Sequence, residues 1–194
     1  MKISSMDGRL NTTIALFKME KSNILTADPV NAGESAALGE AESEGLEIDI
    51  TGELSDSVDM VFSYAYVDAG TSTDLYNFDW AVNLPAGSEL VNVPENSANL
   101  MLTKQFNING ADARLGFTIN YVDDRLGETI DPTYRLPEYT LVNLFGSYQL
   151  NDQVKLTMNI DNLFDEKHYV SSYHKWWTTP GTPTSYVMGV TYAF

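Results

Sequence analysis

The feature that most constrains this chain is an alternation of apolar and polar residues with a period of two, which returns in one segment after another. The clearest example is residues 45–54, where Leu46, Ile48, Ile50 and Leu54 alternate with Glu47, Asp49, Thr51 and Glu53. Successive side chains of a β-strand point to opposite faces, so this segment is predicted to be a strand with one apolar and one charged face.

Seven further segments carry the same pattern, some of them less cleanly. They lie at residues 9–19, 58–68, 98–106, 113–121, 142–150, 154–162 and 185–194. Residues 2–5 are read as the end of an earlier strand that turns back through Met6-Asp7-Gly8-Arg9. The sequence therefore predicts about eight full antiparallel strands and a partial first strand.

The connections between these strands alternate in length. The tight connections lie at residues 55–57, 107–112 and 151–153, and the long ones at residues 20–44, 68–96, 123–138 and 164–183. Transmembrane β-barrels have short turns at one rim and long loops at the other. A compact soluble domain has no physical reason to gather its long connections at one end. We therefore expect an all-β fold, an antiparallel up-and-down transmembrane β-barrel segment.

Two other folds remain open at this point. Eight complete strands are an even number, which would allow a self-contained small outer-membrane barrel. A soluble β-sandwich, acting as a binding module with acidic loops, would also give each strand one buried and one wet face. Pairing of residues 9–19 with the last strand would indicate the small barrel, and a dry core between two sheets would indicate the sandwich.

Composition and charge exclude several classes of protein. The chain has no cysteine, so neither a disulfide framework nor a thiolate metal site holds it together. No apolar run approaches the roughly 20 residues of a transmembrane helix. The net charge of −16 argues against nucleic-acid binding, which needs clustered Lys and Arg. The first residues lack the pattern of an export signal, so we expect either a mature chain or a fragment.

Residues 159–169, Asn-Ile-Asp-Asn-Leu-Phe-Asp-Glu-Lys-His-Tyr, carry a family resemblance. They resemble the C-terminal signature of TonB-dependent outer-membrane receptors. Further segments agree in order along the chain: Asp7-Gly8-Arg9-Leu10-Asn11, Val93-Pro94-Glu95-Asn96 and Leu136-Pro137-Glu138-Tyr139-Thr140-Leu141-Val142. The sequence is most similar to the ferric siderophore receptors, particularly the ferrichrome type. The resemblance implies a 22-stranded barrel, of which residues 1–194 would be the C-terminal portion, with the plug domain absent.

The resemblance also implies a location and partners. The complete receptor would lie in the outer membrane of a Gram-negative bacterium, among outer-membrane lipid, and would take up a ferric siderophore. The TonB system would act through the missing N-terminal part, so this portion alone would not transport. One segment departs from the family: relatives often have an Arg before the final strand, where residues 178–184 read Thr-Thr-Pro-Gly-Thr-Pro-Thr. The role of that Arg is therefore not carried over.

The densest aromatic cluster, Tyr173, Trp176 and Trp177, falls in a predicted external loop. Such rings could contact a ligand such as a siderophore by stacking. The simpler interpretation is that they pack within the loop or at the membrane interface. Both interpretations stay open from the sequence.

The two histidines, His168 and His174, lie in the same loop near Asp165 and Glu166. A metal site needs ligands that converge at fixed geometry, which proximity in a loop does not supply. We therefore expect exposed loop residues here and no metal site.

The acidic segments suggest no catalytic or cofactor site. Residues 68–74 lack the ligand spacing of a calcium loop, so an acidic solvated turn is expected. The acids Glu47, Asp49 and Glu53 are explained as polar lining of a barrel lumen. No residue set has the order of a catalytic triad or a phosphate-binding loop, and we expect no enzyme.

The last strand ends in alternating apolar residues, Val190, Tyr192 and Phe194. A terminal strand of this kind leaves one edge free for pairing. By resemblance to other outer-membrane proteins, these three residues would be the signal that the barrel-assembly machinery reads. Phe194 would also serve as the last aromatic residue at the membrane interface.

Overall fold

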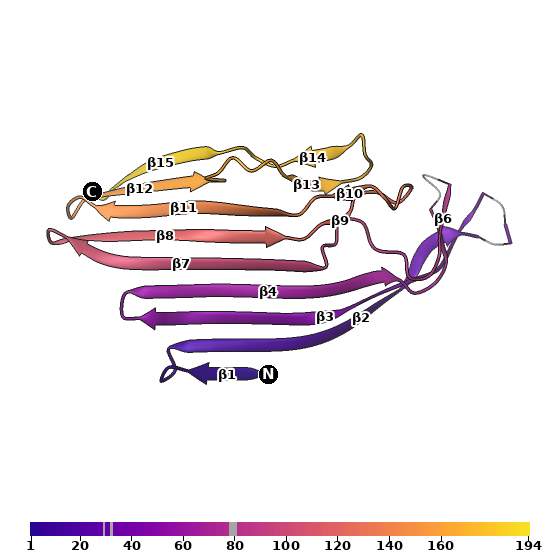
Figure 1. The fold of residues 1–194 in the computed structure, drawn as a ribbon, viewed down its shortest axis with the longest axis horizontal. Coiled ribbons are helices and arrows are strands. Elements are labelled where there is room, and N and C mark those ends of the chain that lie inside the picture. The colour runs from indigo at the N-terminus through magenta and orange to yellow at the C-terminus, as the bar shows by residue number, and fades with distance from the viewer. Residues whose placement is uncertain (29, 32, 78–80) are drawn as a thin grey trace.

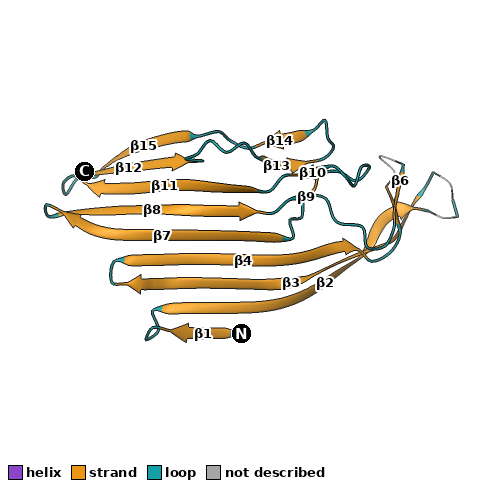
Figure 2. Cartoon of the chain, in the orientation of Figure 1, coloured by secondary structure: helices purple, strands orange, loops and turns teal. Residues whose placement is uncertain are grey.

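The computed structural model describes residues 1–28, 30–31, 33–77 and 81–194. All regular secondary structure within these ranges is β-strand (Figure 2). The described part of the chain also contains no helix with the length and apolarity needed to cross a membrane.

Nine of the strands form one antiparallel sheet, in the order β1-β2-β3-β4-β7-β8-β11-β12-β15 (Figure 1). Their bounds are β1 Lys2–Ser5, β2 Leu10–Ala27, β3 Ser35–Ser55, β4 Val58–Thr71, β7 Asn96–Ile108, β8 Ala111–Val122, β11 Tyr139–Gln149, β12 Val154–Asp161 and β15 Ser185–Tyr192. Each of these strands pairs with the next one along the chain. The predicted meander of eight strands and a partial first strand is therefore confirmed.

The short turns lie together at one end of the sheet, on the left in Figure 1. Between β7 and β8 the two turn residues are Asn109 and Gly110, with φ of 53° and 88°. Positive φ at both positions is the geometry of a tight hairpin turn whose twist matches that of the strands. Asn-Gly is the residue pair that adopts it most readily, which explains why the predicted connection is so short.

The opposite end of the sheet carries the long connections, and three of them contain a small hairpin of their own. These hairpins are β5 Leu75–Asn77 with β6 Val82–Leu84, β9 Arg125–Leu126 with β10 Arg135–Leu136, and β13 Tyr169–Ser172 with β14 Thr178–Pro180. The long connections are therefore folded structures, and they bring distant parts of the chain together at one end.

The expectation of a long loop at residues 20–44 is wrong. Strands β2 and β3 continue through most of it and pair as far as Ala27 with Ser35, with register shifts between Lys21 and Leu25. At about 3.4 Å per residue, the 21 residues of β3 span about 70 Å, against about 30 Å for a bilayer core. The paired part of β2 and β3 is therefore longer than a bilayer core is thick. Beyond that thickness neither face has to be apolar, so the alternation of apolar and polar residues ends although the strands continue.

The register places like residues side by side on each face of the sheet. On one face, apolar residues form rows across the strands, such as Phe62, Leu100, Ile119 and Val142. On the other face lie rows such as Asp49, Ser63, Asn99 and Asn120. We call these the apolar face and the polar face.

No second sheet covers the apolar face among the described residues. Leu115, Met188 and Val190 on this face are 51%, 78% and 72% exposed. The buried apolar residues of the described chain are Ala41, Ala113, Leu126 and Leu136. A dry core between sheets is absent from this part of the chain, so the β-sandwich alternative is wrong.

The two edges of the sheet lie apart. Strands β1 and β15 are at opposite sides in Figure 1, and among the described residues β15 pairs with β12 and not with β1 or β2. The pairing that a closed eight-stranded barrel requires is therefore not formed. The sheet is an open section of barrel wall.

Candidate functional site

Three long connections meet at Asn92. The Asn92 main-chain N–H donates to the Leu126 carbonyl oxygen at 2.9 Å. Its side-chain amide donates to the Ser172 carbonyl oxygen at 2.7 Å and accepts from the Ser172 N–H at 2.8 Å. The amide therefore pairs with Ser172 as a neighbouring strand would. Through its main chain and its side chain, this one residue ties the connection before β7 to the β9–β10 and the β13–β14 hairpins.

Arg125 joins the same two hairpins. Its buried guanidinium donates through Nη2 to the carbonyl oxygens of Tyr169 and Val170, at 2.7 and 3.1 Å. The guanidinium carbon also lies 5.6 Å from the centre of the Tyr139 ring, a distance at which a cation is attracted by the ring face. Hydrogen bonds to a charged donor are stronger than neutral ones, so Arg125 fixes the start of β13 against β9.

Glu128 holds the turn between β13 and β14. Its carboxylate is buried, and Oε2 accepts the Lys175 main-chain N–H at 2.8 Å. The His174 Nε2 lies 3.4 Å from the same oxygen, and the Lys175 ammonium lies 3.9 Å from Oε1. A buried carboxylate is costly unless it is paired, so these contacts favour one position of the turn.

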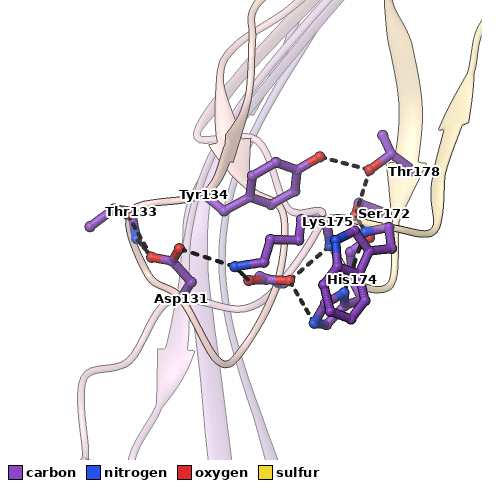
Figure 3. Close-up of polar contacts among 9 residues, drawn as sticks. Asp131, Thr133, Tyr134, Ser172, His174, Lys175 and Thr178 are labelled. Atoms are coloured by element: carbon purple, nitrogen blue, oxygen red, sulfur yellow. Dashed lines mark hydrogen bonds and ion pairs between the residues drawn. The ribbon is translucent and has the colours of Figure 1, made fainter.

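A second carboxylate and a pair of hydroxyls complete the network in Figure 3. Asp131 accepts from the N–H and the hydroxyl of Thr133, at 3.1 and 2.6 Å, and lies 3.8 Å from the Lys175 ammonium. The hydrogen bond from the Thr133 hydroxyl is the main reason that the pKa of Asp131 lies below its ordinary value. The hydroxyls of Tyr134 and Thr178 are 2.7 Å apart.

This network supports Tyr173, Trp176 and Trp177, which we call the aromatic platform. The three side chains are 57%, 80% and 61% exposed. Ring centres of Trp176 and Trp177 lie 4.9 and 6.0 Å from that of His174, and those of Tyr173 and Trp177 lie 6.2 Å apart. The rings thus pack within their turn and still present aromatic surface outward. Contact with a ligand stays a prediction.

The expectation for the histidines is wrong for His174, which is 5% exposed. Its ring lies against the aromatic platform, and its Nε2 lies 3.4 Å from the carboxylate of Glu128, which belongs to a connection far away in sequence. His168 is half-buried, with its ring 4.8 Å from that of Tyr139. Within the described residues, no group of three or more His, Cys, Asp or Glu side chains is arranged to hold a metal ion.

Asn162 fixes the beginning of the connection that carries the aromatic platform. Its buried side chain donates from Nδ2 to the carbonyl oxygens of Glu166 and Thr182, both at 3.0 Å, and accepts the Glu166 N–H at 2.8 Å. Its φ of 50° lies in the left-handed region, which Asn tolerates better than most residues. The segment that begins with Asn162 therefore has a structural role: it closes the base of the loop.

The acidic segment at residues 68–74 differs from the expected solvated turn. Strand β4 continues to Thr71, and Asp68 pairs with Glu44 of β3. The Asp74 carboxylate accepts the Ala86 N–H at 2.9 Å. The paired backbone of β3 extends this far, which the acidic side chains did not indicate.

The acids of β3 lie on the polar face, as expected. Glu47, Asp49 and Glu53 are exposed and pair with Ala65, Ser63 and Asp59 of β4. Toward the short turns the polar face has a hollow of about 510 Å³, whose lining includes Arg114, Lys155, Asp112 and Asp56. The face carries charges of both signs and is suited to water or to a polar segment.

The last strand is an edge strand of the sheet, as expected. Among the described residues β15 pairs along one side, with β12, so its other edge is free. Val190 and Tyr192 lie on the apolar face, opposite Leu156 and Val154, and Phe194 packs against Tyr192 with ring centres 5.2 Å apart. Reading by the barrel-assembly machinery stays a prediction.

The chain matches one protein family over most of its length. Residues 3–163 match the family described as TonB dependent receptor-like, beta-barrel. Among curated proteins, the chain is 39% identical to the metal-pseudopaline receptor CntO of Pseudomonas aeruginosa, over 98% of this chain and 26% of that protein. It is 28% identical to the ferrichrome outer membrane transporter/phage receptor of Escherichia coli, over 97% of this chain and 25% of that protein. The chain spans about a quarter of the length of these relatives.

Solved structures have the same fold. The siderophore receptor PiuA of Acinetobacter baumannii superposes with a TM-score of 0.83 at 26% identity, over 98% of this chain and 27% of that one. The ferripyoverdine receptor of Pseudomonas aeruginosa, bound to ferripyoverdine, superposes with a TM-score of 0.77 at 20% identity, over 98% of this chain and 26% of that one. The second similarity concerns the fold alone.

Proposed function

Because the chain belongs to the TonB-dependent receptor β-barrel family, we propose that it is the C-terminal portion of an outer-membrane receptor that imports metal chelates in the complete protein. One observation carries the proposal. The sheet has an apolar face that nothing in the described chain covers, a polar face with charges of both signs, and its long connections at one end. Such a wall suits lipid on one side and water on the other.

The chelate would approach from the end where the long connections lie. The aromatic platform is exposed there and is held by part-buried hydrogen bonds from its hairpin to two other connections. A rigid aromatic surface binds a ligand at little cost in side-chain entropy. We assign to Tyr173, Trp176 and Trp177 the first contact with the chelate.

Two classes of chelate are candidates. The family resemblance suggests a ferric siderophore. The relative with 39% identity is named for metal-pseudopaline, which favours a second candidate, a metal complex of a pseudopaline-like chelator. Plug, TonB contact and energy coupling would belong to parts of the protein outside residues 1–194. The barrel-assembly machinery would read Val190, Tyr192 and Phe194.

Binding measurements on the full-length protein test this proposal. Calorimetric titration would use a hydroxamate ferric siderophore and metal-loaded pseudopaline as the two probes. Replacing Trp176 and Trp177 by Ala is expected to weaken binding of the correct chelate by about 5- to 10-fold per ring, the usual worth of an aromatic contact. Tyr186→Ala, which removes an exposed aromatic residue from the apolar face, is the matched control. Failure of the unmodified protein to bind either chelate would refute the proposal.

A further inference from the structure

A second hollow lies on the apolar face, toward the short turns. It has a volume of about 510 Å³, which is within the range of roughly 300 to 1,000 Å³ that is usual for small-molecule sites. Its lining includes apolar side chains from β7, β8, β11, β12 and β15, among them Phe106, Leu115, Tyr148, Met158, Met188 and Val190. It lies behind the charged hollow of the polar face, with which it shares Phe106, Ala113, Arg114 and Ser147. The same part of the wall is therefore hollowed on both faces, one apolar and one charged.

The apolar hollow centres on Gly146. One row of the apolar face runs through Leu115, Gly146, Met158 and Met188. Gly146 leaves this row without a side chain between Leu115 and Met158. A Cβ at Gly146 would lie 3.6 Å from the nearest Leu115 side-chain atom and 3.3 Å from the Arg114 carbonyl oxygen. A methyl group at this position would therefore make one tight contact, with the Arg114 carbonyl oxygen, and glycine leaves the space open.

Lys104 lies at the side of this hollow. It is in the same row, paired with Val58 of β4 and Leu115 of β8, and its side chain is exposed. Among the described residues it has no ion-pair partner. Lys104 is the one charged side chain on a large part of the described apolar face. This part runs from the short turns to the row that contains Leu16, Leu46 and Tyr66. A lysine at such a place extends its apolar stem along the surface and its ammonium toward the headgroups.

The short turns of outer-membrane barrels lie on the periplasmic side. We propose that this hollow binds a phospholipid of the periplasmic leaflet, with an acyl chain over Gly146 and the phosphate against the Lys104 ammonium. The inference rests on the proposed function, because it requires the apolar face to lie in the membrane. The combination of an apolar hollow and a nearby positive charge favours a phospholipid as the molecule that binds here. A phospholipid brings an apolar chain and an anion together, whereas the same face of a second copy has no carboxylate in these rows to meet Lys104.

Photo-crosslinking of the full-length protein tests the proposal. The protein is reconstituted in vesicles of phosphatidylethanolamine and phosphatidylglycerol that contain a trace of phosphatidylglycerol with a diazirine in its acyl chain. Labelled positions are mapped by mass spectrometry after illumination. Labelling is expected to concentrate on Leu115, Met158 and Met188. Lys104→Gln should reduce it about fivefold, the usual effect of one lysine on anionic-lipid binding, and Lys104→Arg should leave it unchanged.

Filling the hollow provides an independent test. Gly146→Leu should remove the concentrated labelling, whereas Thr140→Leu, which places the same side chain on the apolar face at its other end, should not. If Gly146→Leu fails to assemble, the two Lys104 variants decide. Two results would overturn the lipid site. One is uniform labelling of the whole apolar face that Lys104→Gln does not change, and the other is cross-linking between two copies of the protein at this site. An apolar face with no label anywhere would instead refute the proposed function.

Discussion

Asn162→Ala is the most informative single change at the base of the loop that carries the aromatic platform. The substitution removes three side-chain hydrogen bonds, two to carbonyl oxygens and one from the Glu166 N–H. At about 1 kcal/mol each, their loss costs about 3 kcal/mol locally. Alanine at a φ of 50° adds about 1 kcal/mol more. We therefore expect local opening of the loop to become easier by about 4 kcal/mol, the sum of these contributions.

Hydrogen–deuterium exchange of the full-length protein in detergent measures this effect at the Glu166 amide. A local loss of about 3 kcal/mol corresponds to faster exchange by about 100-fold, and the conformational cost adds to it. Asn162→Gly loses the same hydrogen bonds without the cost of positive φ, so its exchange should be intermediate. Asn151→Ala is the matched control, because the Asn151 side chain accepts from Gln153 and Val154 at the opposite end of the sheet.

The result that refutes this reasoning is an unchanged exchange rate at Glu166 in a folded Asn162→Ala protein. It would mean that the three hydrogen bonds do not hold the loop, and that the segment beginning at Asn162 has another role.

Three further changes give expected outcomes. Gly52 has a φ of 147°, and a Cβ there would lie 1.9 Å from the Arg9 carbonyl oxygen. Gly52→Ala should therefore destabilise the barrel by more than about 1 kcal/mol in urea unfolding, and Gly146→Ala should do so much less. Glu128→Gln removes the buried charge beside His174, so the Lys175 amide should exchange about 10-fold faster, with Glu166→Gln as the silent control. Hydrogen bonds from Thr133 lower the pKa of Asp131. The ionised Asp131 carboxylate therefore stabilises the turn fully above its ordinary pKa, and this stabilisation is lost as the pH falls through the lowered pKa. Protection of the Thr133 amide should therefore decline only below about pH 4, and Asp131→Asn should abolish that dependence.

Much of the fold can be predicted from the sequence, because each strand of a transmembrane β-barrel must place apolar residues on one face and polar residues on the other. Ile48 and Asp49 had to face opposite sides, and the structure places them there. Asn109-Gly110 is the pair of residues that a two-residue hairpin turn requires, and it marks the β7–β8 turn without further information. Where one face of a strand must meet lipid and the other water, the alternation of apolar and polar side chains predicts where the strand lies and which way its residues face.

The rule fails outside the membrane thickness. The outer parts of β2 and β3 have no apolar face to maintain, so residues 20–44 read as a loop although their backbones pair. The loop network was missed for a related reason. Asn92, Arg125 and Glu128 are single polar residues in long connections, and what makes them structural is hydrogen bonding to residues about 44 to 80 positions away. The predicted gathering of the long connections at one rim is the sequence feature that points toward them, but it does not identify which polar residues make the contacts.

The two faces of one strand should meet different solvents, lipid and water, and spin labelling of β3 tests this most directly. Residues 1–194 contain no cysteine. Single cysteines at each position from Leu46 to Glu53 can therefore be introduced and labelled in the full-length protein in lipid vesicles, once any cysteine elsewhere in it has been replaced by serine. Accessibility to oxygen should peak at positions 46, 48 and 50, and accessibility to a water-soluble nickel complex at positions 47, 49, 51 and 53. Oxygen and nickel profiles that rise and fall together, or that show no period of two, would contradict the account.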